Sequence, residues 1–145
     1  MKSYTYIIVL IIIFLLFRCG SKTRDISMEL ENMIANSKSD TIFFKLSDFF
    51  DSTYDKFLIL PPYTRIHWIE NNLEINIEKV KKTGIERRDD VCVLCIFKNN
   101  ILKEYKILNR NPIDWSIVND FKFIDKNTEF SIVKHHEKYK IEPCK

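Results

Sequence analysis

An apolar run in the second half of the chain, residues 91–97, constrains the fold more than any other segment. A short, continuous, β-branched run of this kind is typical of a buried strand. Lys98-Asn99-Asn100 follows it, and asparagine adopts the positive φ angles that a tight turn requires. Residues 101–108 then alternate in polarity as a strand does, although apolar and polar residues are not cleanly separated onto its two faces. The sequence therefore predicts a β-hairpin in the C-terminal half of the chain.

Shorter patterns predict further strands and two helices. Apolar residues at helical spacing predict a helix over residues 25–36, with Asp25 as its N-cap. Strands are expected over residues 41–46, 55–60 and 130–134, a variable segment over 75–88, and a frayed polar tail from His135. Because strands and helices do not alternate strictly, we expect an α+β fold, with a small antiparallel sheet packed by two short helices.

The second helix follows a pair of prolines. Pro61-Pro62 ends the strand before it, because proline cannot donate a hydrogen bond to a sheet. We expect Thr64 to be the N-cap and the helix to end near residues 71–72. On that register Tyr63 and Trp68 take the positions of a hydrophobic staple, in which two apolar side chains pack across the start of a helix.

The N-terminal segment has the layout of an export signal. Lys2 precedes an apolar run over residues 7–17, which is shorter than the roughly 20 residues that a membrane-spanning helix needs. We expect residues 1–18 to be a signal peptide or N-terminal anchor, 19–24 a polar tether, and 25–145 a single folded domain. This organisation predicts an exported protein, anchored to a membrane of the bacterial cell envelope on its periplasmic or outer side.

The placement of Cys19 resembles the signal of bacterial lipoproteins, in which a cysteine is lipidated and becomes the new N-terminus. Leu16 fits the position three residues before the cysteine. Arg18 departs from the pattern, since a small residue is expected before the cleavage site, and Phe17 is bulkier than usual. The resemblance implies a lipid such as palmitate on Cys19, with an uncleaved anchor as the alternative.

The other cysteines are read as structural residues. Cys92 and Cys95 form a C-x-x-C spacing, but residues three apart in a strand point to opposite faces. A redox C-x-x-C requires both sulfur atoms together, so we interpret both as small core residues. A disulfide with Cys144 and metal binding remain alternatives, because export permits disulfides.

Residues 54–64 read Tyr-Asp-Lys-Phe-Leu-Ile-Leu-Pro-Pro-Tyr-Thr and resemble a group of small, uncharacterised bacterial lipoproteins. In that group an aromatic-Asp-Lys, an apolar strand and Pro-Tyr-Thr lead into a helix, and a hairpin of the kind Phe-x-Asn-Gly follows later. Tyr54 stands where the group commonly has Trp, and Asn100 where it commonly has Gly. The resemblance covers eleven residues and implies no activity.

This motif also supplies the candidate binding site. Tyr54, Asp55, Lys56, Tyr63 and Thr64 would line a groove beside the strand-to-helix turn. The alternative is that the motif only fixes that turn, since proline and capping residues already explain it.

Catalytic and metal-binding signatures are weak. His67 and Glu70 share a helix face, but one imidazole and one carboxylate fall short of a metal site. No G-x-S-x-G, phosphate-loop or H-E-x-x-H motif occurs. We therefore expect no catalytic residue, metal or cofactor.

Charge argues against a nucleic-acid partner. The chain has 23 basic and 20 acidic residues, and removing Lys2 and Arg18 with the signal leaves 21 against 20. Nucleic-acid binders concentrate basic residues on one face, whereas this chain has only scattered pairs. We expect a non-enzymatic binding module, tethered to a membrane, for a protein or small ligand. The alternatives are an envelope inhibitor or immunity-like protein and, ranked last, a hydrolase that uses Asp55 or the face of His67 and Glu70.

Overall fold

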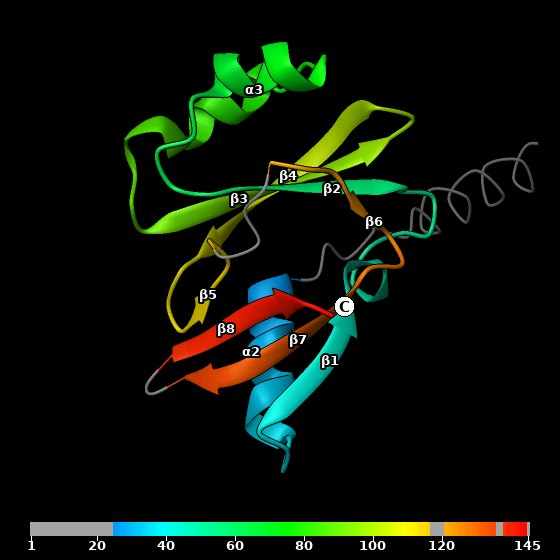
Figure 1. Ribbon diagram of the computed structural model, residues 1–145, viewed down its shortest axis with the longest axis vertical. Helices are drawn as coiled ribbons and strands as arrows, with labels where there is room; N and C mark the ends of the chain where they lie inside the picture. The colour runs from blue at the N-terminus through cyan, green and yellow to red at the C-terminus, as the bar shows by residue number, and fades with distance from the viewer. Residues whose placement is uncertain (1–24, 117–120, 136–137, 145) are drawn as a thin grey trace, which may run out of the picture.

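The computed structural model describes residues 25–116, 121–135 and 138–144 (Figure 1). The predicted signal or anchor over residues 1–18, the tether over 19–24 and the lipidation site Cys19 lie outside the described residues. Within the described ranges, no helix is both long enough and apolar enough to cross a membrane.

The described strands form two four-stranded sheets, which occupy the lower and upper halves of Figure 1. The first has the order β1-β7-β8-β5, formed by Thr41–Lys45, Glu129–His135, Lys138–Pro143 and Ile113–Asp114. The second has the order β4-β3-β2-β6, formed by Ile101–Asn109, Val91–Lys98, Lys56–Leu60 and Ile124–Asp125. All pairs are antiparallel except β5 with β8. The α+β class predicted from the sequence is confirmed.

Helices of two kinds accompany the sheets. The α-helices are α2 (Ile26–Asn36) and α3 (Ile66–Leu73), and the 3-10 helices are η1 (Leu46–Asp48), η2 (Glu78–Thr83) and η3 (Ile85–Arg87). Asp25 caps α2 as predicted, because its Oδ1 accepts hydrogen bonds from the N–H groups of Ser27 at 3.0 Å and Met28 at 3.4 Å.

The two sheets and α2 enclose a first apolar core. Phe44 of β1 lies at its centre: its ring stacks on Phe130 of β7 with centroids 5.5 Å apart and meets the ring of Trp115 edge-on at 6.4 Å. Buried side chains of the second sheet complete this core: Phe57, Ile59, Cys92, Leu94, Ile96 and Leu108. The first core therefore joins the two sheets into one packed unit.

A second core covers the opposite face of the second sheet. There α3, η2 and η3 pack against β2 and β3 (Figure 1). Side chains of β3 alternate between the two cores, with Cys92, Leu94 and Ile96 in the first and Val91, Val93, Cys95 and Phe97 in the second. Because both faces of β3 are covered, the run over residues 91–97 has no polar position.

The predicted hairpin of β3 and β4 is confirmed. Asn99 and Asn100 form its turn with φ angles of 52° and 61°. Ile96 lies opposite Glu104 but Phe97 lies opposite Leu102, which leaves Lys103 as an extra residue in β4. This bulge shifts the side-chain alternation by one position, so the two faces of β4 are not segregated in the sequence.

The predicted N-cap of the second helix is wrong. Helix α3 begins at Ile66, with Arg65 in the cap position and no side-chain cap from Arg65. The Thr64 hydroxyl instead donates a hydrogen bond to the carbonyl oxygen of Pro61 at 2.6 Å. The N–H of Ile66 is satisfied by Oε1 of Glu86 at 2.9 Å. A carboxylate twenty residues away therefore takes the capping role, which local sequence cannot indicate.

The frayed tail predicted from His135 is also wrong. Residues 138–143 form β8, which pairs with β7 and β5 in the interior of the first sheet. Ile141 is the fully buried residue of this strand. A single buried position among charged neighbours is too weak a pattern to predict a strand. The variable segment likewise contains η2 and η3, and Ile77 before η2, Val80 in η2 and Ile85 in η3 are fully buried.

Candidate functional site

The five residues of the predicted groove lie at the two ends of β2. Tyr54, Asp55 and Lys56 are at its start, and Tyr63 and Thr64 follow its end. From Lys56 the remaining four residues of β2 extend about 13 Å, at about 3.3 Å each, before the chain reaches the second group. The structure therefore does not bring the five side chains into one groove.

The group at the start of β2 fixes the β3–β4 turn. Asp55 Oδ2 accepts a hydrogen bond from the N–H of Asn99 at 3.0 Å, and the N–H of Asp55 donates to the carbonyl oxygen of Phe97 at 3.1 Å. Lys56 Nζ donates to Asn100 Oδ1 at 2.8 Å and lies 5.2 Å from the ring centroid of Phe123. These contacts favour the structural interpretation of the Asp-Lys motif.

Tyr54 packs its half-buried ring against the first core. Burial raises the pKa of Tyr54, and a hydrogen bond to the carboxylate of Glu104 raises it further. The same carboxylate forms an ion pair with Lys106 at 3.1 Å. The phenol is therefore a neutral hydrogen-bonding group near physiological pH, without the features of a catalytic base.

The group after the end of β2 has a different character. Tyr63 has a φ of 61°, a left-handed conformation in which glycine or asparagine is usual. Its N–H donates to the carbonyl oxygen of Ile85 at 2.9 Å, which holds the backbone in place. The side chain is 60% exposed, whereas Thr64 next to it is buried. An aromatic side chain is thus held in solvent by a strained backbone.

Two more aromatic residues lie at α3, the helix that follows Tyr63: Trp68 on the helix, and Phe121, which is half-buried against the second core. Trp68 in the first turn of α3 is 50% exposed, and its ring meets that of Phe121 edge-on with centroids 5.4 Å apart. Phe121 also has a positive φ, 48°. We call Tyr63, Trp68 and Phe121 the aromatic surface. From the sequence we expected Trp68 to pack against Tyr63 as a hydrophobic staple, and no local pattern indicated that Phe121 would contact Trp68.

The helix face of His67 and Glu70 is occupied by structural contacts. Glu70 Oε1 accepts a hydrogen bond from the N–H of Ile77 at 2.9 Å and so fixes the chain after α3. His67 Nε2 lies 3.1 Å from Asn71 Nδ2. Among the described residues, no three or more His, Cys, Asp or Glu side chains are grouped so that they could hold a metal ion.

The cysteines of β3 diverge as predicted. Cys92 faces the first core and Cys95 the second, so they cannot form a disulfide with each other. Burial raises the pKa of each thiol to about 12. Both are therefore protonated and poorly nucleophilic at neutral pH. Cys144, which is half-buried, is also a free thiol.

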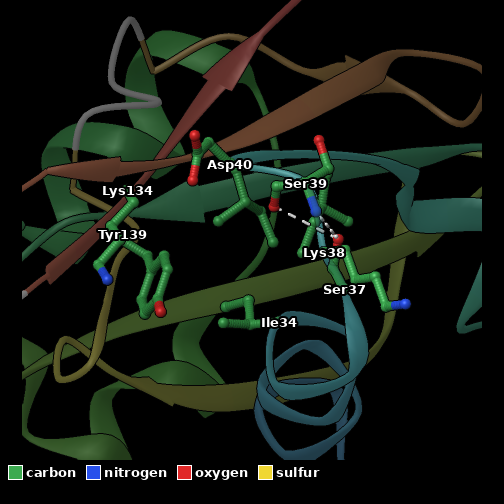
Figure 2. A pocket seen from close by; sticks show the side chains of 9 residues that line it. Ile34, Ser37, Lys38, Ser39, Asp40, Lys134 and Tyr139 are labelled. Carbon is green, nitrogen blue, oxygen red and sulfur yellow. Dashed lines mark hydrogen bonds between the residues drawn. The ribbon is translucent and has the colours of Figure 1, made fainter.

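A small cavity of about 140 Å³ opens beside the C-terminal end of α2 (Figure 2). Ile34, Ile42 and Ile132 form its apolar lining, and Lys134 and Tyr139 lie together on one side of it. Sites for drug-sized ligands usually measure about 300–1,000 Å³. This cavity accommodates only a group of a few atoms, so we rank it below the aromatic surface.

The described residues include large aromatic side chains that are exposed to solvent, among them Tyr63 and Trp68. Among these described residues, the aromatic surface is best suited to contact a second molecule, because Trp and Tyr dominate the energetics of protein interfaces. The resemblance of residues 54–64 to small lipoproteins remains a prediction. Comparison with models of known families, with curated protein sequences and with solved structures finds no match to this chain.

Proposed function

We propose that this chain is an exported envelope protein, tethered to a membrane by its N-terminal segment, whose domain binds a protein partner without catalysing a reaction. The aromatic surface carries the proposal. Its partner would present an apolar pocket that receives the rings of Tyr63 and Trp68.

Backbone strain supports a binding role for Tyr63. A non-glycine residue in the left-handed region costs about 1–2 kcal/mol. Strained positions of this kind cluster at functional sites, where the surrounding structure enforces them. The Tyr63 ring is largely exposed, so burial within the domain offsets little of this cost.

Trp68, five residues after Tyr63 in the chain, and Phe121 supply a second apolar area whose two rings are in contact. Large aromatic side chains lose little conformational entropy on binding, since only two side-chain torsions are fixed. The edge-to-face contact with Phe121 already restricts the Trp68 ring. The surface is therefore partly preorganised for a protein partner.

Membrane tethering rests on the N-terminal sequence. A single acyl chain gives only weak and reversible membrane binding, so a second contact would strengthen attachment. Metabolic labelling with a fatty acid is the direct test. Wild type is expected to incorporate the label, and Cys19→Ala to lose it. If neither incorporates label, the lipid tether is excluded and an uncleaved anchor takes its place.

Partner binding is tested by placing a photoreactive phenylalanine at position 63 of the full chain in intact cells. Phe43 provides a matched control, because it is 59% exposed and lies on β1 of the other sheet. We expect a discrete protein adduct from position 63, none from position 43, and loss of the adduct when Trp68→Ala is added. Equal adducts from both positions, or persistence in Trp68→Ala, would exclude the aromatic surface as the binding site.

A further inference from the structure

We infer that β4 pairs with β4 of a second copy of this chain, antiparallel and centred on Ile107. β4 lies at one edge of the second sheet and, among the described residues, pairs with β3 alone. Its other edge therefore presents unpaired backbone N–H and C=O groups along nine residues. This pairing would join the two second sheets into one continuous sheet.

The exposed side chains of β4 favour such pairing. Ile107 is 47% exposed although it lies in a regular strand. Proteins usually protect an open edge with charges, bulges or short strands. The bulge at Lys103 does so near the hairpin turn. Residues 104–109 keep regular pairing with β3 without a bulge, and their two charged side chains, Glu104 and Lys106, neutralise each other in an ion pair at 3.1 Å.

Symmetry restricts the register. Antiparallel edge strands in one sheet are related by a two-fold axis perpendicular to the sheet, so the central residue meets its own copy. Centring on Glu104 would oppose two carboxylates, and centring on Lys106 would oppose two ammonium groups; both arrangements are destabilising. Centring on Tyr105 would place the bulged Lys103 within the new ladder.

The register centred on Ile107 avoids these conflicts. The exposed Ile107 side chain is buried against Ile107 of the second copy, and Tyr105 lies opposite Asn109. Glu104, which is ion-paired with Lys106, lies opposite Arg110 of the second copy, which is ion-paired with Asp114, so no like charges face each other at the ends of the ladder. Since the axis is perpendicular to the sheet, the α3 faces of the two copies lie on the same side.

Cysteine cross-linking of the full chain in its native membranes tests this register. Directly opposite residues have Cβ atoms about 5 Å apart, whereas a residue offset by four positions is about 13 Å away. With a short thiol cross-linker, Ile107→Cys is expected to give a covalent dimer. Tyr105→Cys and Ile101→Cys are expected to remain at the wild-type background set by the native cysteines. No dimer from Ile107→Cys, or an equal yield from Tyr105→Cys, would overturn the proposal.

A pair of charge variants tests the interface without cross-linking. Ile107→Lys places two ammonium groups opposite each other and should weaken dimerisation about tenfold or more in mild detergent. Ile101→Lys is the matched control, because Ile101 is 58% exposed on the same strand but outside the ladder. Unchanged dimerisation of folded Ile107→Lys protein, or equal weakening by both variants, would contradict the pairing.

Discussion

The carboxylate of Asp55 accepts a hydrogen bond from the backbone N–H of Asn99 at 3.0 Å, across a separation of 44 residues. This bond connects the start of β2 to the turn of the β3–β4 hairpin. The aromatic-Asp-Lys segment and the asparagine turn, which are far apart in the sequence, are therefore parts of one local structure. Asp55 belongs to the framework of the domain rather than to a groove.

Replacing Asp55 by alanine should destabilise the domain. The variant removes the acceptor for the Asn99 N–H, and the loss of this solvent-exposed hydrogen bond costs about 0.5–1.5 kcal/mol. Urea denaturation of the purified protein measures the free energy of unfolding. Asp51→Ala is the control, because Asp51 is exposed and accepts local hydrogen bonds from the N–H and the side chain of Thr53, two residues away. Equal effects of the two variants would contradict the role of Asp55.

Asn100→Gly should stabilise the hairpin by about 0.5–1 kcal/mol. Position 100 has a φ of 61°, which glycine adopts without steric cost, and Asn-Gly is the preferred pair for this turn. The variant also loses the exposed hydrogen bond from Lys56 Nζ, which contributes little in water. Thermal unfolding measures the effect. A lower melting temperature would mean that the bond to Lys56 outweighs the relief of strain.

Tyr63→Gly should separate stability from binding. Glycine removes the left-handed strain, so the free energy of unfolding should stay within about 1 kcal/mol of wild type or rise. In pull-downs from membranes, recovery of the protein that is cross-linked from position 63 should fall strongly in the same variant. Strong destabilisation would instead show that the ring supports the fold.

Alkaline pH should weaken the fold through the two buried thiols. Burial raises the pKa of Cys95 to about 12 from an ordinary value of 9.0. The folded state thus holds its proton at pH values where the unfolded chain loses it. The free energy of unfolding is therefore unaffected by these thiols below about pH 9. As the pH rises from there toward 12, it decreases by about 1.4 kcal/mol per pH unit for each thiol.

Cys95→Val removes one of these titrating groups and nearly conserves volume. Urea denaturation between about pH 8 and pH 10.5 should show a flatter decline of the unfolding free energy for this variant than for wild type. Identical declines in the two proteins would mean that Cys95 ionises in the folded state as readily as in the unfolded chain.

Local sequence patterns were sufficient for elements whose determinants are local. The Asn99-Asn100 turn, the cap of α2 at Asp25 and the apolar run of β3 each depend on neighbouring residues. The cap of α3 depends on Glu86, and β8 depends on one buried residue, Ile141, so neither has a local signature.

The candidate site was harder to predict for the same reason. The sequence analysis included Tyr63 in the candidate groove, but Tyr54, Asp55 and Lys56, which were expected to lie near it, are at the far end of β2. Phe121 reaches Trp68 from a distant segment of the chain, through a contact that no sequence spacing indicates. Only tertiary structure brings the aromatic surface together.

The position of β3 between the two cores also determines how the domain unfolds. Loss of either core would expose one face of a strand whose residues 91–97 are fully buried. Separate opening of the α3 side or of the other sheet is therefore costly, and the domain should unfold as a single cooperative unit. The amide protons of β3 that are bonded to β2 and β4 should exchange with solvent only through global unfolding, and therefore more slowly than those of α2 and β1.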